Sequence, residues 1–131
     1  MTINQSQVEC LAETLYHEAR GEPREGRAAV AMVVLNRASD LKRWRDTICE
    51  VVRQPGQFEW YDENHVKPRY ERETWMAMED ESQEYILKYI LGVPFVPEEL
   101  KEATFFSVGG FKNPKRIFIA RVGGHRFFKT E

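Results

Sequence analysis

The sequence predicts a mainly helical α+β fold, a single domain over residues 1–131 with a small antiparallel β-sheet near its C-terminus. Apolar residues recur at helical spacing in several segments before residue 92. Two strand-like segments flank Gly123 and Gly124, the pattern of a two-residue hairpin. The 131 residues are 42% hydrophobic and 31% charged and contain no internal repeat, which suits one globular domain.

Three helices are expected. Ser6 and Glu9 form a capping-box pattern at the start of the first, and Gly21 follows its end. The second covers residues 24–37, and its middle is apolar on every side, which predicts a central position in the fold. The third covers residues 72–91 and stops at Gly92.

Strand character is confined to the C-terminal part of the chain, in residues 104–108, 117–122 and 125–129. Residues 38–70 mix aromatic, polar and turn residues without a regular period. The prediction is therefore a helical body followed by a short sheet.

Glu18 is the candidate catalytic residue. A helical wheel places it at the edge of the apolar stripe of the first helix, seven residues after Leu11 and three after Leu15. Partial burial and the C-terminal end of a helix both favour the protonated form of a carboxyl, which a general acid at neutral pH requires. Periodicity leaves one alternative open, a structural glutamate paired with a buried arginine such as Arg27 or Arg37.

Three ordered blocks resemble the spore-cortex-lytic-enzyme (SleB-like) family of cell-wall hydrolases. They are residues 11–22 continued by 25–37 (LAETLYHEARGE and EGRAAVAMVVLNR), residues 47–60 (TICEVVRQPGQFEW) and residues 124–128 (GHRFF, a His-x-Phe ending). The resemblance implies a lysozyme-like catalytic domain with lytic transglycosylase or muramidase activity. It also implies that Glu18, the first glutamate of the Glu-Ala-Arg-Gly-Glu run, is the catalytic acid.

The expected reaction is cleavage of peptidoglycan between N-acetylmuramic acid and N-acetylglucosamine, with 1,6-anhydromuramic ends as the transglycosylase product. It needs no cofactor and no metal. Where the family often has two tyrosines, residues 104–110 read TFFSVGG, and the charged segment 62–73 is particular to this chain. Specificity for the muramic lactam of spores is therefore not implied, and ordinary peptidoglycan is the expected substrate.

Six further residues are candidates for substrate binding, each with a plainer alternative. Gln57 follows a Pro-Gly turn and offers an amide that suits an N-acetyl group. Phe58 and Trp60 could stack on sugar rings, or they could belong to the core. Thr104 could hydrogen-bond substrate from a strand, and His125 could bind substrate or make a structural hydrogen bond. Glu22 could bind substrate or place a charge at the N-terminus of the second helix. The six are Gln57, Phe58, Trp60, Thr104, His125 and Glu22.

Other functional classes fit less well. A thiol hydrolase would need Cys49 beside His65 or His125, and nothing in the sequence brings them together. The three histidines show no metal-ligand spacing. A non-catalytic glycan-binding module remains an alternative, although binding alone would not need a half-buried glutamate.

The net charge of −2 gives no global basic field, so we expect peptidoglycan and not nucleic acid as the partner. The longest apolar run, residues 28–35, is too short to span a bilayer, so no stable membrane association is expected. We also expect the protein to be a monomer. The N-terminus lacks a secretory pattern. We therefore expect synthesis in the cytoplasm without a signal peptide and action at the bacterial cell wall, as for a phage-type endolysin. Cys10 and Cys49 are expected to be free thiols.

Overall fold

The computed structural model describes residues 4–40, 47–54, 58, 70–108 and 115–130. It contains the helices α1 (Gln5–Ala19), α2 (Arg24–Ser39), α3 (Ile48–Arg53) and α4 (Arg72–Leu91) and the short 3-10 helix η1 (Glu98–Leu100). The strands β1 (Phe105–Ser107), β2 (Arg116–Val122) and β3 (His125–Thr130) follow. The predicted fold class is confirmed: a mainly helical body carries a small antiparallel sheet at its C-terminal end.

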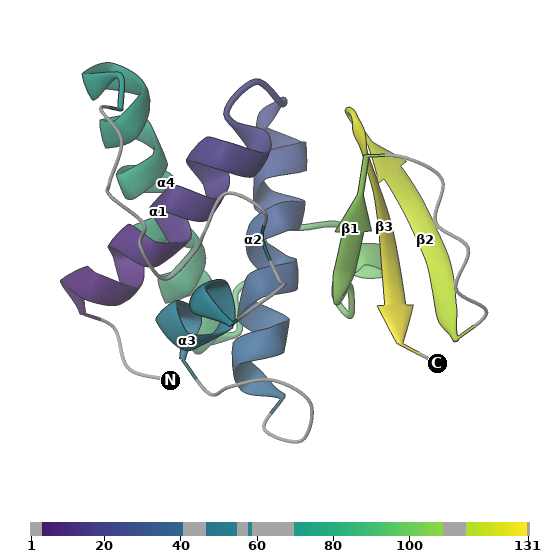
Figure 1. Ribbon diagram of the computed structural model, residues 1–131. Helices are drawn as coiled ribbons and strands as arrows, with labels where there is room; N and C mark the ends of the chain where they lie inside the picture. The colour runs from purple at the N-terminus through teal and green to yellow at the C-terminus, as the bar shows by residue number, and fades with distance from the viewer. Residues whose placement is uncertain (1–3, 41–46, 55–57, 59–69, 109–114, 131) are drawn as a thin grey trace.

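Helix α2 lies at the centre of the molecule. Figure 1 shows it between the other helices on one side and the sheet on the other. From Ala29 to Leu35 its side chains are almost completely buried, with Met32 the most accessible of them at 6%. The all-round apolar pattern of this helix therefore predicted its position correctly, and α2 runs two residues beyond the expected end.

Helix α1 begins earlier than the capping box indicated. Asn4 is the N-cap, and its side-chain oxygen accepts a hydrogen bond from the Gln7 N–H at 3.0 Å. The prediction of Ser6 as the cap was wrong because asparagine is as good a cap as serine and lies two residues before it. At the other end the helix stops at Ala19, one turn before α2 begins.

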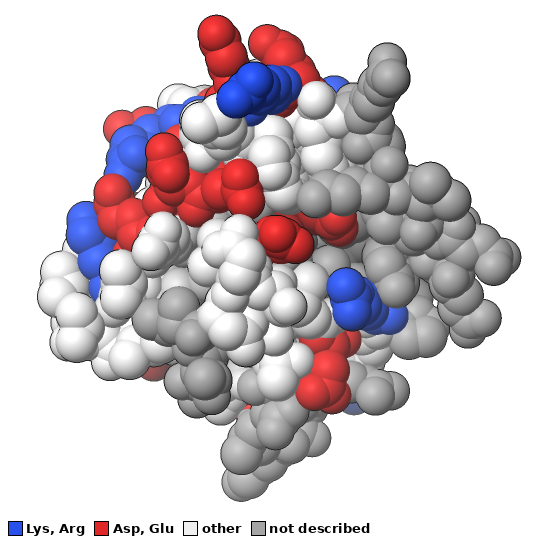
Figure 2. Space-filling model, turned by 90° about the vertical axis from the view of Figure 1, so that its left-hand side faces the viewer, with Lys and Arg blue, Asp and Glu red and all other residues white. Residues whose placement is uncertain are grey.

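Helix α4 has the bounds that the sequence predicted. Gly92 ends it in the left-handed region at φ 72°, and the Val93 N–H returns to the carbonyl of Lys88. Figure 2 views the molecule from the helical side, where acidic and basic side chains are interspersed over the surface. Among the described residues, no helix is long and apolar enough to cross a bilayer.

The sheet has the strand order β1-β3-β2, with both pairs antiparallel. Phe105 pairs with Phe128 in the first ladder, and Val122 pairs with His125 in the second. Gly123 and Gly124 form the turn between β2 and β3, as predicted, and Gly123 has φ 58°, a conformation that favours glycine.

The cysteines form a disulfide, contrary to the expectation of free thiols. Cys10 of α1 is joined to Cys49 of α3, with the two Cα atoms 5.3 Å apart. Helix α3 has only six residues, too few for a helical period to be recognised in the sequence, and its packing against α1 is what brings the two sulfurs together.

Candidate active site

The candidate site is built around the elbow between α1 and α2, residues 20–23. Glu18 lies in the last turn of α1 and is partly buried, whereas its neighbours Leu15 and Ala19 are almost completely buried. Partial burial of Glu18 agrees with the wheel, although Glu9 and Glu13 of the same helix are partly buried as well. Four residues further on, Glu22 lies in the elbow itself, and its side chain is 20% exposed.

The Glu22 carboxylate is bound by the hairpin turn of the sheet. Its two oxygens lie 3.1 and 3.0 Å from the backbone nitrogen of Gly124, whose N–H donates to them. One of these oxygens also lies 3.5 Å from Nδ1 of His125. The helical body and the sheet therefore meet at Glu22, four residues after Glu18 and just past the end of α1.

His125 is the first residue of β3 and is only 3% exposed. Burial lowers the pKa of its imidazole, and the nearby Glu22 carboxylate acts in the opposite direction. Among the described residues Nδ1 has no hydrogen-bond partner, so the charged neighbour at 3.5 Å is what this nitrogen faces.

Aromatic rings extend this cluster. The Phe106 ring packs edge-on to the His125 ring, with 5.3 Å between centroids. The ring of Phe58, a residue that is 7% exposed, also lies near Phe106, with 6.3 Å between centroids. The structure thus brings together three of the predicted substrate-binding residues, Glu22, His125 and Phe58, although the burial of Phe58 also fits the core position that the sequence left open.

Thr104 lies at the opposite end of the sheet. Its hydroxyl is 3.0 Å from that of Thr130, and its carbonyl accepts a hydrogen bond from Nε of Arg37 at 2.8 Å. Four residues of strand separate it from the level of the hairpin turn, roughly 13 Å at the usual rise. Gln57 and Trp60 lie outside the described residues.

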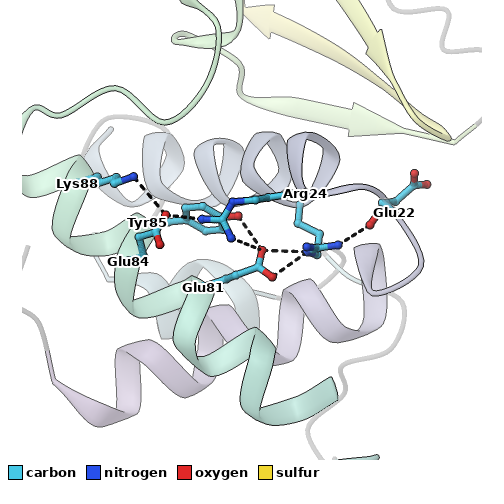
Figure 3. Close-up of polar contacts among 7 residues, drawn as sticks. Glu22, Arg24, Glu81, Glu84, Tyr85 and Lys88 are labelled. Atoms are coloured by element: carbon cyan, nitrogen blue, oxygen red, sulfur yellow. Dashed lines mark hydrogen bonds and ion pairs between the residues drawn. The ribbon is translucent and has the colours of Figure 1, made fainter. Parts of the chain in front are cut away.

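An ionic network behind the elbow was not predicted. Nε of Arg27 lies 2.9 and 3.1 Å from the two carboxylate oxygens of Glu81, and Nη1 of the same arginine donates to the carbonyl of Glu22. The Tyr85 hydroxyl donates to Glu81 at 2.7 Å, and burial with this acidic neighbour raises the pKa of the phenol. Figure 3 shows these contacts running from α4 across α2 to Glu22.

The sequence did contain a sign of this network. Glu81 falls among the apolar positions of α4, three residues after Met78 and four before Tyr85, and it is 8% exposed. Arg27, considered as a partner for Glu18, is the partner of Glu81 instead. The same wheel argument that selected Glu18 would have selected Glu81, since carboxylates are rarely buried without a partner.

A separate cavity of about 310 Å³ lies between the C-terminal halves of α2 and α4 and the segment that follows α4. Met32, Tyr89 and Phe95 are among its lining residues, and none of the predicted site residues lines it. No group of three or more potential metal ligands occurs in the part of the chain that the structure describes. The elbow, and not this cavity, therefore gathers the candidate catalytic residues.

Known proteins resemble this chain both in fold and in sequence. The catalytic domain of the germination-specific lytic transglycosylase SleB from Bacillus anthracis superposes with a TM-score of 0.59 over 97% of both chains, at 24% identity, which establishes the shared fold. A spore cortex-lytic enzyme of Oceanobacillus iheyensis is 33% identical over 89 residues, 68% of this chain. The chain spans 29% of that relative's length.

The sequence also matches the cell wall hydrolase family over residues 21–128, a range that contains Glu22, the hairpin turn and His125 and begins three residues after Glu18. This range is most of the chain. The chain therefore belongs to the cell wall hydrolase family.

Proposed function

We propose that this protein cleaves the glycan strands of peptidoglycan between N-acetylmuramic acid and N-acetylglucosamine, as a lytic transglycosylase with Glu18 as its catalytic acid and base. The observation that carries the proposal is the position of Glu18. A partly buried carboxyl lies in the last turn of α1, four residues before Glu22, which contacts the sheet in a member of the cell wall hydrolase family.

In the first step protonated Glu18 donates its proton to the glycosidic oxygen, and the bond from that oxygen to the anomeric carbon of muramic acid breaks. The N-acetyl group of the same sugar stabilises the positive charge at the anomeric carbon, as in substrate-assisted glycosidases. Glu18 is then a carboxylate, ready to act as a base.

In the second step the Glu18 carboxylate takes the proton of the muramic 6-hydroxyl while the oxygen bonds to the anomeric carbon. The product carries a 1,6-anhydro ring, and Glu18 is protonated again. Atoms and charges balance without water, metal or cofactor. One carboxyl is therefore enough, which leaves Glu22 free for its contacts with the sheet.

The names of the relatives support this choice, since one is called a spore cortex-lytic enzyme and the structural neighbour a lytic transglycosylase. Hydrolysis by a muramidase is the second candidate, because a water molecule at the same site would replace the 6-hydroxyl. A non-catalytic glycan-binding module is the third, and the half-buried position of Glu18 argues against it.

We further propose that the protein acts at the bacterial cell wall, as a phage-type endolysin. The Cys10–Cys49 disulfide supports a site of action outside the reducing cytosol, because disulfides persist mainly in oxidising compartments.

Mass spectrometry of purified peptidoglycan after digestion distinguishes the candidates. Fragments ending in 1,6-anhydromuramic acid are the expected result. Reducing muramic ends, 18 mass units heavier through the added water, would establish a muramidase. Freed peptides or intact strands would overturn glycan cleavage altogether.

A further inference from the structure

Glu22 makes contacts through both its side-chain carboxylate and its backbone carbonyl, and these hold the α1–α2 elbow in place. Its carboxylate binds the hairpin turn through the Gly124 N–H, over a separation of 102 residues in the chain. Its carbonyl oxygen accepts from Arg27, which Glu81 of α4 holds in turn. Figure 3 shows the two ends pointing in different directions, the carbonyl toward the arginine and the carboxylate away from it.

The turn is built to admit this carboxylate. A Cβ atom added to Gly124 would lie 2.6 Å from one Glu22 oxygen, and one added to Gly123 would lie 2.1 Å from the other. Gly26 of α2 borders the same side chain, since a Cβ there would be 3.2 Å from the Cβ of Glu22. Three positions without side chains thus surround Glu22, and only one of them, Gly123, needs glycine for its own backbone conformation.

We infer that Glu22 is a positioning residue, whose carboxylate fixes the β2–β3 turn against the α1–α2 elbow and so sets the place of the sheet relative to Glu18. This inference rests on the proposed function, in which Glu18 is the catalytic acid. Glu22 follows Glu18 by four residues, just past the end of α1, so we expect a shift of the sheet at Glu22 to change the space that a sugar occupies beside Glu18. Displacements on the order of 1 Å are enough to reduce the rate of a correctly assembled site strongly.

A double-mutant cycle between Glu22 and Gly124 tests the contact itself. In Gly124→Ala the new methyl group displaces the carboxylate, so this variant and Glu22→Ala should disrupt the same contact. Gly124 is outside the left-handed region, so alanine brings no backbone strain of its own. We expect both single variants to lower the melting temperature and the double variant to melt no lower than the worse of the two.

The rate per folded molecule tests the positioning role. With soluble peptidoglycan fragments as substrate, we expect kcat to fall about tenfold in both Glu22→Ala and Gly124→Ala, with KM changed less than twofold, because a displaced wall acts on the geometry of the reaction more than on affinity. Glu22→Gln keeps an oxygen that accepts from Gly124, and it should recover most of kcat. Glu25→Ala is the matched control, because Glu25 is exposed in the first turn of α2 and its substitution removes the same negative charge.

Two results would overturn the inference. One is additive losses of melting temperature in the cycle, which would mean that Glu22 and Gly124 do not act through one contact. The other is a normal kcat per folded molecule in Glu22→Ala, which would reduce Glu22 to a stabilising residue. The melting cycle needs no activity, so it remains decisive if glycan cleavage itself proves wrong. If Glu22→Ala does not fold, Gly124→Ala carries the rate measurement, with Glu22→Gln as the variant that keeps the contact: a normal kcat per folded molecule in Gly124→Ala would then overturn the inference.

Discussion

Arg27 and Glu81 form a two-point ion pair that joins α2 to α4, with Nε 2.9 and 3.1 Å from the carboxylate oxygens. The side chains are 18% and 10% exposed, so each would leave a poorly solvated charge if the other were removed. The pair also supports the elbow, because Arg27 donates to the carbonyl of Glu22. It is therefore a structural contact with a direct connection to the candidate site.

Replacing Arg27 by methionine should lower the free energy of unfolding by about 3 kcal/mol, because the buried Glu81 carboxylate then keeps only the Tyr85 hydroxyl and the more distant Arg24, 4.0 Å away. Urea denaturation followed by circular dichroism measures this loss. The control is Lys88→Met, which removes the exposed ion pair with Glu84 and should cost under about 1 kcal/mol. Equal losses in the two variants would contradict the view that burial makes the Arg27 pair important.

Reduction of the Cys10–Cys49 disulfide should destabilise the protein by about 4 kcal/mol, since the bond closes a loop of 39 residues in the unfolded chain. Denaturation curves with and without a phosphine reductant test this expectation. The Cys10→Ser/Cys49→Ser variant should show the lower stability in both conditions. A reductant effect of the same size in that variant would mean that the disulfide is not its source.

The stability of the folded protein should fall as the pH drops from neutrality through about 6.5, the usual pKa of an unfolded histidine. Burial lowers the pKa of His125 in the folded state, so the unfolded chain binds the proton first and gains stability relative to the native one. The loss continues down to the folded pKa and then levels off. His125→Asn should show a flatter profile over this range.

Glu22→Gln should make the same profile steeper, because the carboxylate that favours the protonated imidazole is gone. The other two histidines are unchanged in all three proteins, so differences between the curves report on His125. Parallel curves for the wild type and His125→Asn would show that this residue does not govern the acid limb.

Gln57→Ala is expected to reduce cleavage strongly and binding to insoluble peptidoglycan only modestly. The reason is the amide side chain that follows Pro55 and Gly56 in the sequence, which suits an orienting contact that acts mainly in the transition state. A pull-down, a digestion rate and a melting curve on one sample measure the three quantities. A lower melting temperature with full activity per folded molecule would make Gln57 a structural residue.

The sequence predicted those parts of the fold that rest on a long local pattern. Helix α4 keeps its predicted bounds, and the apolar run of α2 led correctly to its central place. The hairpin at Gly123 followed from turn chemistry. The position of Glu18 at the edge of a buried stripe was likewise a local property of one helix.

The features that were missed depend on contacts between distant segments. Nothing in the sequence pairs Glu22 with Gly124 or Cys10 with Cys49, because such pairs are fixed only when helices and sheet pack together. Helix α3 is too short for its period to be read. The sequence named Glu22 as a candidate for substrate binding, and its contact with the sheet required the structure.

The most direct test of the central claim is the rate at which Glu18→Gln digests purified peptidoglycan. The change is nearly isosteric and removes only the ability to donate and accept the proton, so we predict a loss of about a hundredfold or more with an unchanged melting curve. Glu9→Gln, at a partly buried glutamate in the first half of the same helix, should digest at the wild-type rate. Digestion by Glu18→Gln at close to the wild-type rate would contradict the assignment of Glu18 as the catalytic residue.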